Sequence, residues 1–217
     1  MRRSMGQPEV PRLRGVLHAV TAPLAVVGGL VLVFVADSPA TRIAVAIFVA
    51  TSVALFATSA TYHMGDWPAR TKAWLRRADH SNIFLIIAGT YTPLSLLLLP
   101  PDQARTLLII VWSGAIAGVL IGNFWPTAPR WVNAPIYLAL GWAAVFYLPG
   151  FSSAGAIILA LIVTGGLMYT IGAVVYATKW PQISHAWFGF HEMFHSFTIA
   201  GFTAHFAAIA IALVAVA

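Results

Sequence analysis

Residues 188–214 read FGFHEMFHSFTIAGFTAHFAAIAIALV, and this stretch decides the class of fold. It contains His191, Glu192 and His195 in the order HExxH, which on one helix face is the zinc-binding pattern of metalloproteases. The same stretch is apolar along most of its length, and about 20 apolar residues suffice for a helix to cross a bilayer. The two histidines therefore belong to a predicted membrane span, where their chemistry is an open question.

The composition of the whole chain supports a membrane protein. Of 217 residues, 60% are hydrophobic and only 8% are charged, and the mean hydropathy is +0.86. A soluble domain carries roughly 25% charged residues. The absence of cysteine excludes disulfides and thiolate metal sites. The net charge of +6 comes from basic residues scattered among short loops, which indicates membrane orientation and not nucleic-acid binding.

Seven predicted spans divide the chain at clusters of proline, glycine and charged residues. They are Val16–Val35, Ile43–Tyr62, Ser81–Leu99, Leu107–Phe124, Ala134–Leu148, Ala154–Ala177 and Phe188–Val214. The sequence thus predicts an all-α membrane protein, a seven-transmembrane helix bundle, in which residues 1–15 form a cytoplasmic tail and residues 16–217 the membrane domain.

The basic residues also predict the orientation of the bundle, because Lys and Arg are retained on the cytoplasmic side. With the N-terminus inside, ten lie in inner segments: Arg2, Arg3, Arg12, Arg14, Arg70, Lys72, Arg76, Arg77, Arg130 and Lys179. The outer segments carry only Arg42 and Arg105. We therefore expect a cytoplasmic N-terminus and a C-terminus outside.

Polar residues within spans are costly and mark functional sites. In this orientation Ser59 and His63 end the second span on the inner side, Asp79 precedes the third, and His191 and His195 begin the seventh. His191 and His195 share a helix face, and His63 adds a third imidazole. Three imidazoles and a water form a common catalytic zinc set.

Several roles stay open for the polar groups around these histidines. Asp79 could bind the metal, act as general base, or pair with a nearby arginine. Ser59 could bond an imidazole, the water or a substrate oxygen, or its own helix backbone. Glu192 is either a protease-like base or an interfacial carboxylate paired with Lys179 or Arg77. His18, at the inner end of the first span, is a candidate for a supporting role.

Two features of the spans predict packing. Gly114, Gly118 and Gly122 form a smooth helix face, suited to close contact within the bundle or between protomers. His205 lies about 15 Å along the helix from His195, too far to share a metal, and is expected to form a hydrogen bond in the core.

Three segments carry a resemblance to a known family: SATYH at 59–63, DHSNIFLIIAGTYTP at 79–93 and HEMFHSFTIAGFTAH at 191–205. They resemble the hemolysin III proteins of bacteria, which belong with the progestin and adipoQ receptor group that includes the adiponectin receptors. The resemblance implies seven helices and a zinc ion near the cytoplasmic side. It places the zinc ligands on His63, His191 and His195, an aspartate near the ion on Asp79, and a serine on Ser59.

The function expected from these features is a zinc-dependent hydrolase of lipid amides or esters, in a multi-pass protein of the plasma membrane. The resemblance adds that receptor relatives are linked to slow hydrolysis of ceramide-type amides, whereas bacterial members are named for haemolysis. Two alternatives are a non-enzymatic receptor, sensor or homeostasis factor with structural zinc, and a pore-forming cytolysin. The expected partners are the bilayer and a lipid-like substrate or ligand; the sequence leaves the oligomeric state open.

Overall fold

The computed structural model describes residues 11–125 and 130–216, so residues 1–10 of the predicted tail, with Arg2 and Arg3, lie outside the described residues. The described chain is helical, without strands. Its elements are α1 Val16–Val35, α2 Pro39–Met64, α3 Ala69–Leu98, α4 Pro101–Phe124, α5 Arg130–Gly141, the 3-10 helix η1 Trp142–Tyr147, α6 Leu148–Ser152, α7 Ala156–Thr178 and α8 Phe190–Val216. Seven segments of the described chain are long and apolar enough to cross a membrane, which confirms the predicted all-α bundle.

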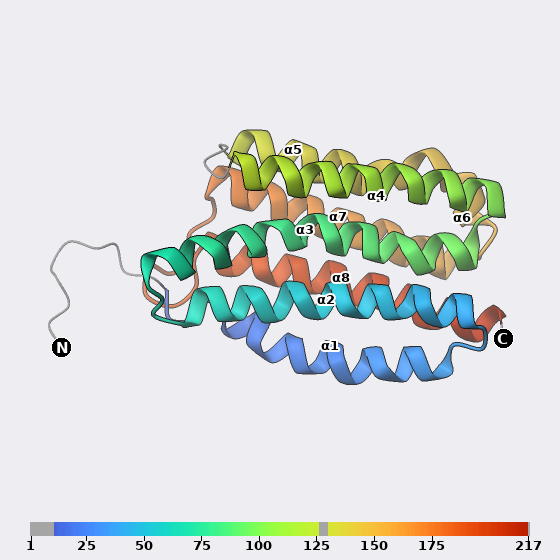
Figure 1. Ribbon diagram of the computed structural model, residues 1–217, viewed down its shortest axis with the longest axis horizontal. Helices are drawn as coiled ribbons and strands as arrows, with labels where there is room; N and C mark the ends of the chain where they lie inside the picture. Colours follow the sequence, from blue (N-terminus) through green and yellow to red (C-terminus); the bar gives the residue numbers. More distant parts are fainter. Residues whose placement is uncertain (1–10, 126–129, 217) are drawn as a thin grey trace, which may run out of the picture.

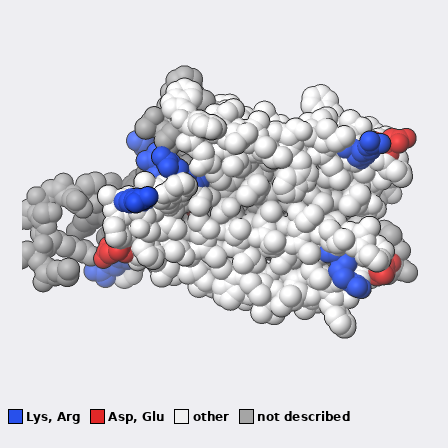
Figure 2. Space-filling model, in the orientation of Figure 1, with Lys and Arg blue, Asp and Glu red and all other residues white. Residues whose placement is uncertain are grey.

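The spans run side by side along the long axis of the molecule, in alternating directions (Figure 1). Successive helices pack against each other from α1 to α4, as do α7 and α8, and α8 also contacts α1 and α3. Figure 2 shows the charged residues at the two ends of the bundle, with an uncharged band between them. Within α1, Leu24 and Phe34 are 66% and 87% exposed, as expected of residues that face lipid.

The fifth span is not one continuous helix, in contrast to the prediction of Ala134–Leu148. It covers Pro135–Ser152 and combines α5, η1 and α6. The hydroxyl of Tyr91 on α3 donates a hydrogen bond to the carbonyl of Gly141 (2.5 Å) and accepts one from the amide of Ala144 (2.8 Å). A side chain that takes backbone groups out of the helical ladder breaks its regularity, so a tertiary contact sets this interruption.

Helix α3 begins at Ala69, well before the predicted start at Ser81. The intervening residues are mostly Ala, Arg, Lys and Leu, which are strong helix formers, so the helix continues beyond the apolar segment. The guanidinium of Arg77 lies 5.4 Å from the centre of the Trp74 ring. This extension places Asp79 inside a helix and not in a loop.

The glycines of α4 serve packing within the bundle. A Cβ added to Gly118 would overlap the ring of Phe84, and one added to Gly114 would meet Leu140 at 2.7 Å. Apart from its own helix, no described residue lies within 4 Å of the corresponding position at Gly122. Of the two predicted uses, close contact within the bundle is therefore the one observed at Gly114 and Gly118.

Candidate metal centre

Three histidines meet at the end of the bundle where α2 finishes and α8 begins. His63 lies in the last turn of α2, and His191 and His195 lie in the first turns of α8. The Nε2 atoms of His63 and His191 are 3.1 Å apart. One ligand atom from each of the three residues lies within 4.8 Å of the others. The structure thus brings together the three imidazoles that the sequence places at one membrane depth.

The cluster has the donor chemistry and spacing of a metal site. Ligand atoms about 2.0–2.1 Å from a tetrahedral ion lie about 3.4 Å from one another, close to the 3.1 Å between His63 and His191. His195 is 2% exposed, and its Nδ1 has no hydrogen-bond partner among the described residues. Imidazole nitrogens are common ligands of divalent transition metals. The three histidines could therefore hold one metal ion.

Asp79 and Ser59 lie beside this cluster. The Oδ2 atom of Asp79 is 3.8 Å from Nε2 of His63, and its carboxyl group is hydrogen-bonded to the side chain of Ser59. Ser59 is 1% exposed and lies one turn before His63 on α2. Less than one turn beyond Asp79, the side-chain amide of Asn82 donates to the carbonyl of Ala54 (3.0 Å) and fixes α3 against α2. A carboxylate is thus held at the metal centre by a separate helix.

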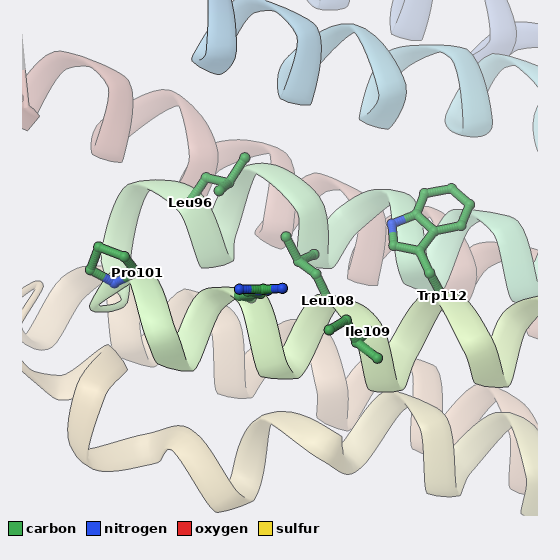
Figure 3. A pocket seen from close by; sticks show the side chains of 6 residues that line it. Leu96, Pro101, Leu108, Ile109 and Trp112 are labelled. Carbon is green, nitrogen blue, oxygen red and sulfur yellow. The ribbon is translucent and has the colours of Figure 1, made fainter.

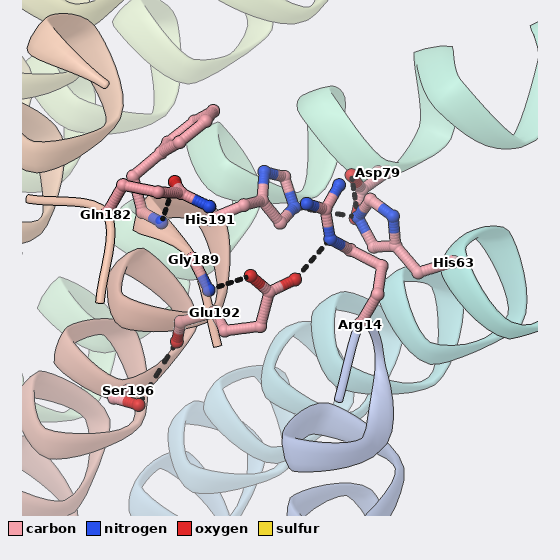
Figure 4. Close-up of polar contacts among 9 residues, drawn as sticks. Arg14, His63, Asp79, Gln182, Gly189, His191, Glu192 and Ser196 are labelled. Atoms are coloured by element: carbon pink, nitrogen blue, oxygen red, sulfur yellow. Dashed lines mark hydrogen bonds and ion pairs between the residues drawn. The ribbon is translucent and has the colours of Figure 1, made fainter. Parts of the chain in front are cut away.

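Glu192 is engaged in a structural role, as Figure 4 shows. It is fully buried, and one carboxylate oxygen forms an ion pair with Arg14. The other accepts a hydrogen bond from the amide of Gly189 (2.8 Å), the arrangement of a glutamate in the first turn of a helix that caps the residue before it. The predicted pairing of Glu192 with Lys179 or Arg77 is wrong; the partner is Arg14.

The segment before α1, residues 11–15, crosses the same end of the bundle, and we call it the N-terminal strap. Its amides of Arg12 and Leu13 donate to the carbonyls of Ala186 and Trp187, at 2.9 and 3.3 Å. Gly15 has φ of 83°, and a Cβ there would lie 2.9 Å from Cβ of His63. A left-handed residue in such close contact requires glycine.

Sequence reasoning missed the N-terminal strap, because it treated Arg14 only as an orientation signal. One signal in the sequence could have indicated it: Glu192 is an isolated acid at the start of an apolar span, and such an acid needs a basic partner elsewhere in the chain. Nothing in the hydropathy pattern indicates that the basic residue precedes α1, since the ion pair joins residues 178 positions apart.

His18 also lies at the cluster. Its ring stacks on that of His195, with the centroids 3.8 Å apart and the planes 13° from parallel. It also meets the ring of Phe56 in a T-shaped arrangement, with centroids 5.1 Å apart. His205, by contrast, lies deeper in the bundle, where its Nε2 is 3.1 Å from the carbonyl oxygen of Ile162, as predicted for a core hydrogen bond.

A surface groove between α3 and α4 is separate from the histidines (Figure 3). Its lining is mostly apolar: Leu96, Pro101, Arg105, Leu108, Ile109 and Trp112. Leu96 is 17 residues beyond Asp79 on α3, about 25 Å along the helix axis. The groove therefore lies toward the opposite end of the bundle and contributes nothing to the metal centre.

Comparison with known proteins agrees with this architecture. A family model described as "Haemolysin-III related" matches residues 7–206. The chain is 34% identical to the "Hemolysin-3 homolog" of Bacillus subtilis (strain 168) over 138 residues, which cover 63% of this chain and 62% of that relative. It is 29% identical to "Hemolysin-3" of Bacillus cereus over 192 residues, which cover 86% and 84% of the two chains. With seven membrane-crossing segments and a match over most of its length, the chain is a multi-pass membrane protein and belongs to the haemolysin-III related family.

Proposed function

We propose that this protein is a zinc-dependent hydrolase of lipid amides or esters that acts at the cytoplasmic face of the plasma membrane. The observation that carries the proposal is the meeting of three imidazoles and a carboxylate from three helices, with Nε2 of His63 lying 3.1 Å from His191 and 3.8 Å from Asp79. Three imidazole ligands leave a fourth position for catalysis, whereas a structural site usually has four protein ligands. The set of three imidazole ligands therefore favours a catalytic zinc ion over a structural one.

Each side chain has a distinct task in this proposal. His63, His191 and His195 hold the zinc ion, which when bound supplies a Lewis acid and activates water. Asp79 takes the proton of the attacking water as general base and passes it to the leaving group. Ser59, hydrogen-bonded to Asp79, fixes the direction of that carboxylate. Glu192 takes no part, because both its oxygens are engaged elsewhere.

The depth of the site supports a lipid substrate. The indole of Trp67 donates to the carbonyl of Thr61, two residues before His63 (2.8 Å). Tryptophan is enriched at membrane interfaces, and the ester and amide carbonyls of lipids lie at that level. The exposed basic residues Arg70 and Lys72 follow at the same end, as expected for the cytoplasmic side. A lipid would thus present its carbonyl at the histidines without leaving the bilayer.

The packing of α2 on α8 weighs against a zinc ion that merely joins these helices. Deeper in the membrane Phe48 stacks on Phe202 with centroids 5.7 Å apart, and Phe56 meets the same ring edge-on at 5.0 Å. All three phenylalanines are at least 93% buried, so the two helices share an apolar contact that needs no metal. The apolar core and the uncharged outer band (Figure 2) likewise disfavour a wide aqueous pore.

Metal analysis of purified protein, combined with turnover of lipid amides and esters in detergent micelles, tests the proposal. We expect about one zinc per chain in the wild type and in Asp79→Asn, with turnover only in the wild type, because asparagine cannot accept the proton. His63→Ala should lose the zinc, whereas His205→Ala, the matched control outside the cluster, should keep it. Zinc-free wild-type protein would refute the metal centre. Undiminished turnover by Asp79→Asn would refute the assigned base.

A further inference from the structure

His18 is a buried histidine whose ring nitrogens have no partner. It is 2% exposed, and neither Nδ1 nor Nε2 forms a hydrogen bond within the described part of the chain. It lies in the first turn of α1, directly after the N-terminal strap, and its ring is stacked on that of His195. Buried polar groups without a partner are rare in native proteins and call for an explanation.

Packing alone does not explain the choice of histidine at this position. Among the described residues, its ring contacts include a stacked one with His195 and a T-shaped one with Phe56, and a phenylalanine would make both without burying two polar nitrogens. A bound water, an ion, a ligand or a catalytic role accounts for such a group, and beside the three histidines a bound ligand is one that chemistry at the cluster would use. The position of His18 against His195 places that ligand at the metal centre.

The stacking also indicates that His18 and His195 would not both hold the same ion. A metal ion lies in the plane of the imidazole that holds it. The planes of the two rings are 13° from parallel and their centroids are 3.8 Å apart, so the two rings could not both direct a nitrogen at one ion within their own planes. His18 is therefore poorly placed as a fourth ligand of that ion, and well placed for an atom of a molecule bound beside it.

We propose that His18 is a ligand-binding residue of the metal centre and hydrogen-bonds a polar atom next to the carbonyl of the bound lipid. This inference rests on the proposed function and narrows its substrate class. The lipid carries a second hydrogen-bonding group, such as an amide N–H or a neighbouring hydroxyl, within reach of the carbonyl held at the histidines. A simple ester without such a group would leave the nitrogens of His18 unpaired and would bind more weakly.

Binding of acetohydroxamate to the cobalt-loaded protein tests this role without an identified substrate. The probe carries a carbonyl and an adjacent N–H and hydroxyl group, and its binding changes the visible absorption of cobalt. His18→Phe retains the ring and its stacking but removes the nitrogens. His18→Gln and His18→Asn restore a polar atom near the position of Nε2 or Nδ1, respectively. His205→Phe, which removes a partly buried imidazole outside the cluster, is the matched control.

We expect His18→Phe to bind as much cobalt as the wild type but to bind acetohydroxamate about three- to tenfold more weakly, the loss of one hydrogen bond. One of the two amide variants should recover the affinity, and His205→Phe should match the wild type. If His18→Phe does not fold, the two amide variants still test the proposal. At least one of them must bind acetohydroxamate with the affinity of the wild type.

Three results would overturn the role of His18 while leaving the metal centre intact. In the first, His18→Phe binds acetohydroxamate with an affinity within twofold of that of the wild type. In the second, the cobalt-loaded wild type does not bind the probe. In the third, both amide variants bind it more weakly than the wild type. Loss of cobalt from His18→Phe would show that His18 supports the metal and not the ligand, and would also overturn the proposal. Failure of the wild type to bind cobalt would instead refute the proposed function itself.

Discussion

Replacement of Glu192 by glutamine distinguishes a structural glutamate from a catalytic one within the HExxH sequence. Glutamine has nearly the same shape, and its amide oxygen can still accept the hydrogen bond from Gly189. The change removes the negative charge and turns an NH2 group toward Arg14. The side chain of Arg14 is 22% exposed and loses its partner. Breaking a fully buried ion pair costs about 3–5 kcal/mol; because Arg14 keeps some contact with water, we expect about 2–3 kcal/mol.

For a chain of this length each kcal/mol corresponds to about 2–4 °C in Tm, so Glu192→Gln should unfold about 5–10 °C below the wild type. Thermal unfolding in detergent micelles measures the shift. Metal content should stay at the wild-type value, because none of the three imidazoles is changed. The double variant Arg14→Gln/Glu192→Gln should be more stable than the sum of the single changes predicts, since it leaves no unpaired buried charge.

An unchanged Tm together with complete loss of turnover in Glu192→Gln would refute this reasoning. That result would make Glu192 the general base, as in soluble zinc proteases, and would leave Asp79 without its assigned role.

Two further predictions concern packing and orientation. Gly118→Ala should destabilise the protein by about 1–3 kcal/mol, because the ring of Phe84 occupies the position of the new methyl group. Gly122→Ala, whose methyl group would meet no described residue outside its own helix within 4 Å, should be neutral or stabilising in the same unfolding measurement. Because the chain lacks cysteine, a single introduced cysteine reports the side of the membrane on which it lies. In intact cells a membrane-impermeant maleimide should label Asp37→Cys but not Asp66→Cys. The reverse pattern would contradict a cytoplasmic N-terminus.

The fold and the histidine cluster could be predicted because both follow from the positions of apolar segments along the sequence. Seven apolar runs give the spans, and their alternating direction puts the end of the second and the start of the seventh on one side of the membrane. This is enough to bring His63 to His191 across 128 positions of sequence. No distance between helices enters the argument, because the bilayer fixes the depth of each residue.

The early start of α3 follows from local helix propensity, but the other features that sequence reasoning missed depend on contacts between distant segments. The break at Gly141 is set by the hydroxyl of Tyr91 on another helix, and periodicity within the fifth span does not indicate it. The partner of Glu192 is Arg14 and not the predicted Lys179 or Arg77, because the N-terminal strap folds across the start of α8. Hydropathy gives the depth of a charged group but not its direction around the helix.

The position of the α8 start within the bundle explains why a glutamate follows His191 without serving as a base. The first amides of a helix lack partners in their own helix, and in a membrane protein water does not always reach them. Here Gln182 accepts from the amide of Phe190 (3.2 Å), and Glu192 accepts from that of Gly189. A charged cap in a buried position needs a counter-ion, which Arg14 supplies. Since the acid of α8 is used in this way, the base that we propose comes from another helix, and Asp79 of α3 is the carboxylate whose Oδ2 lies 3.8 Å from Nε2 of His63.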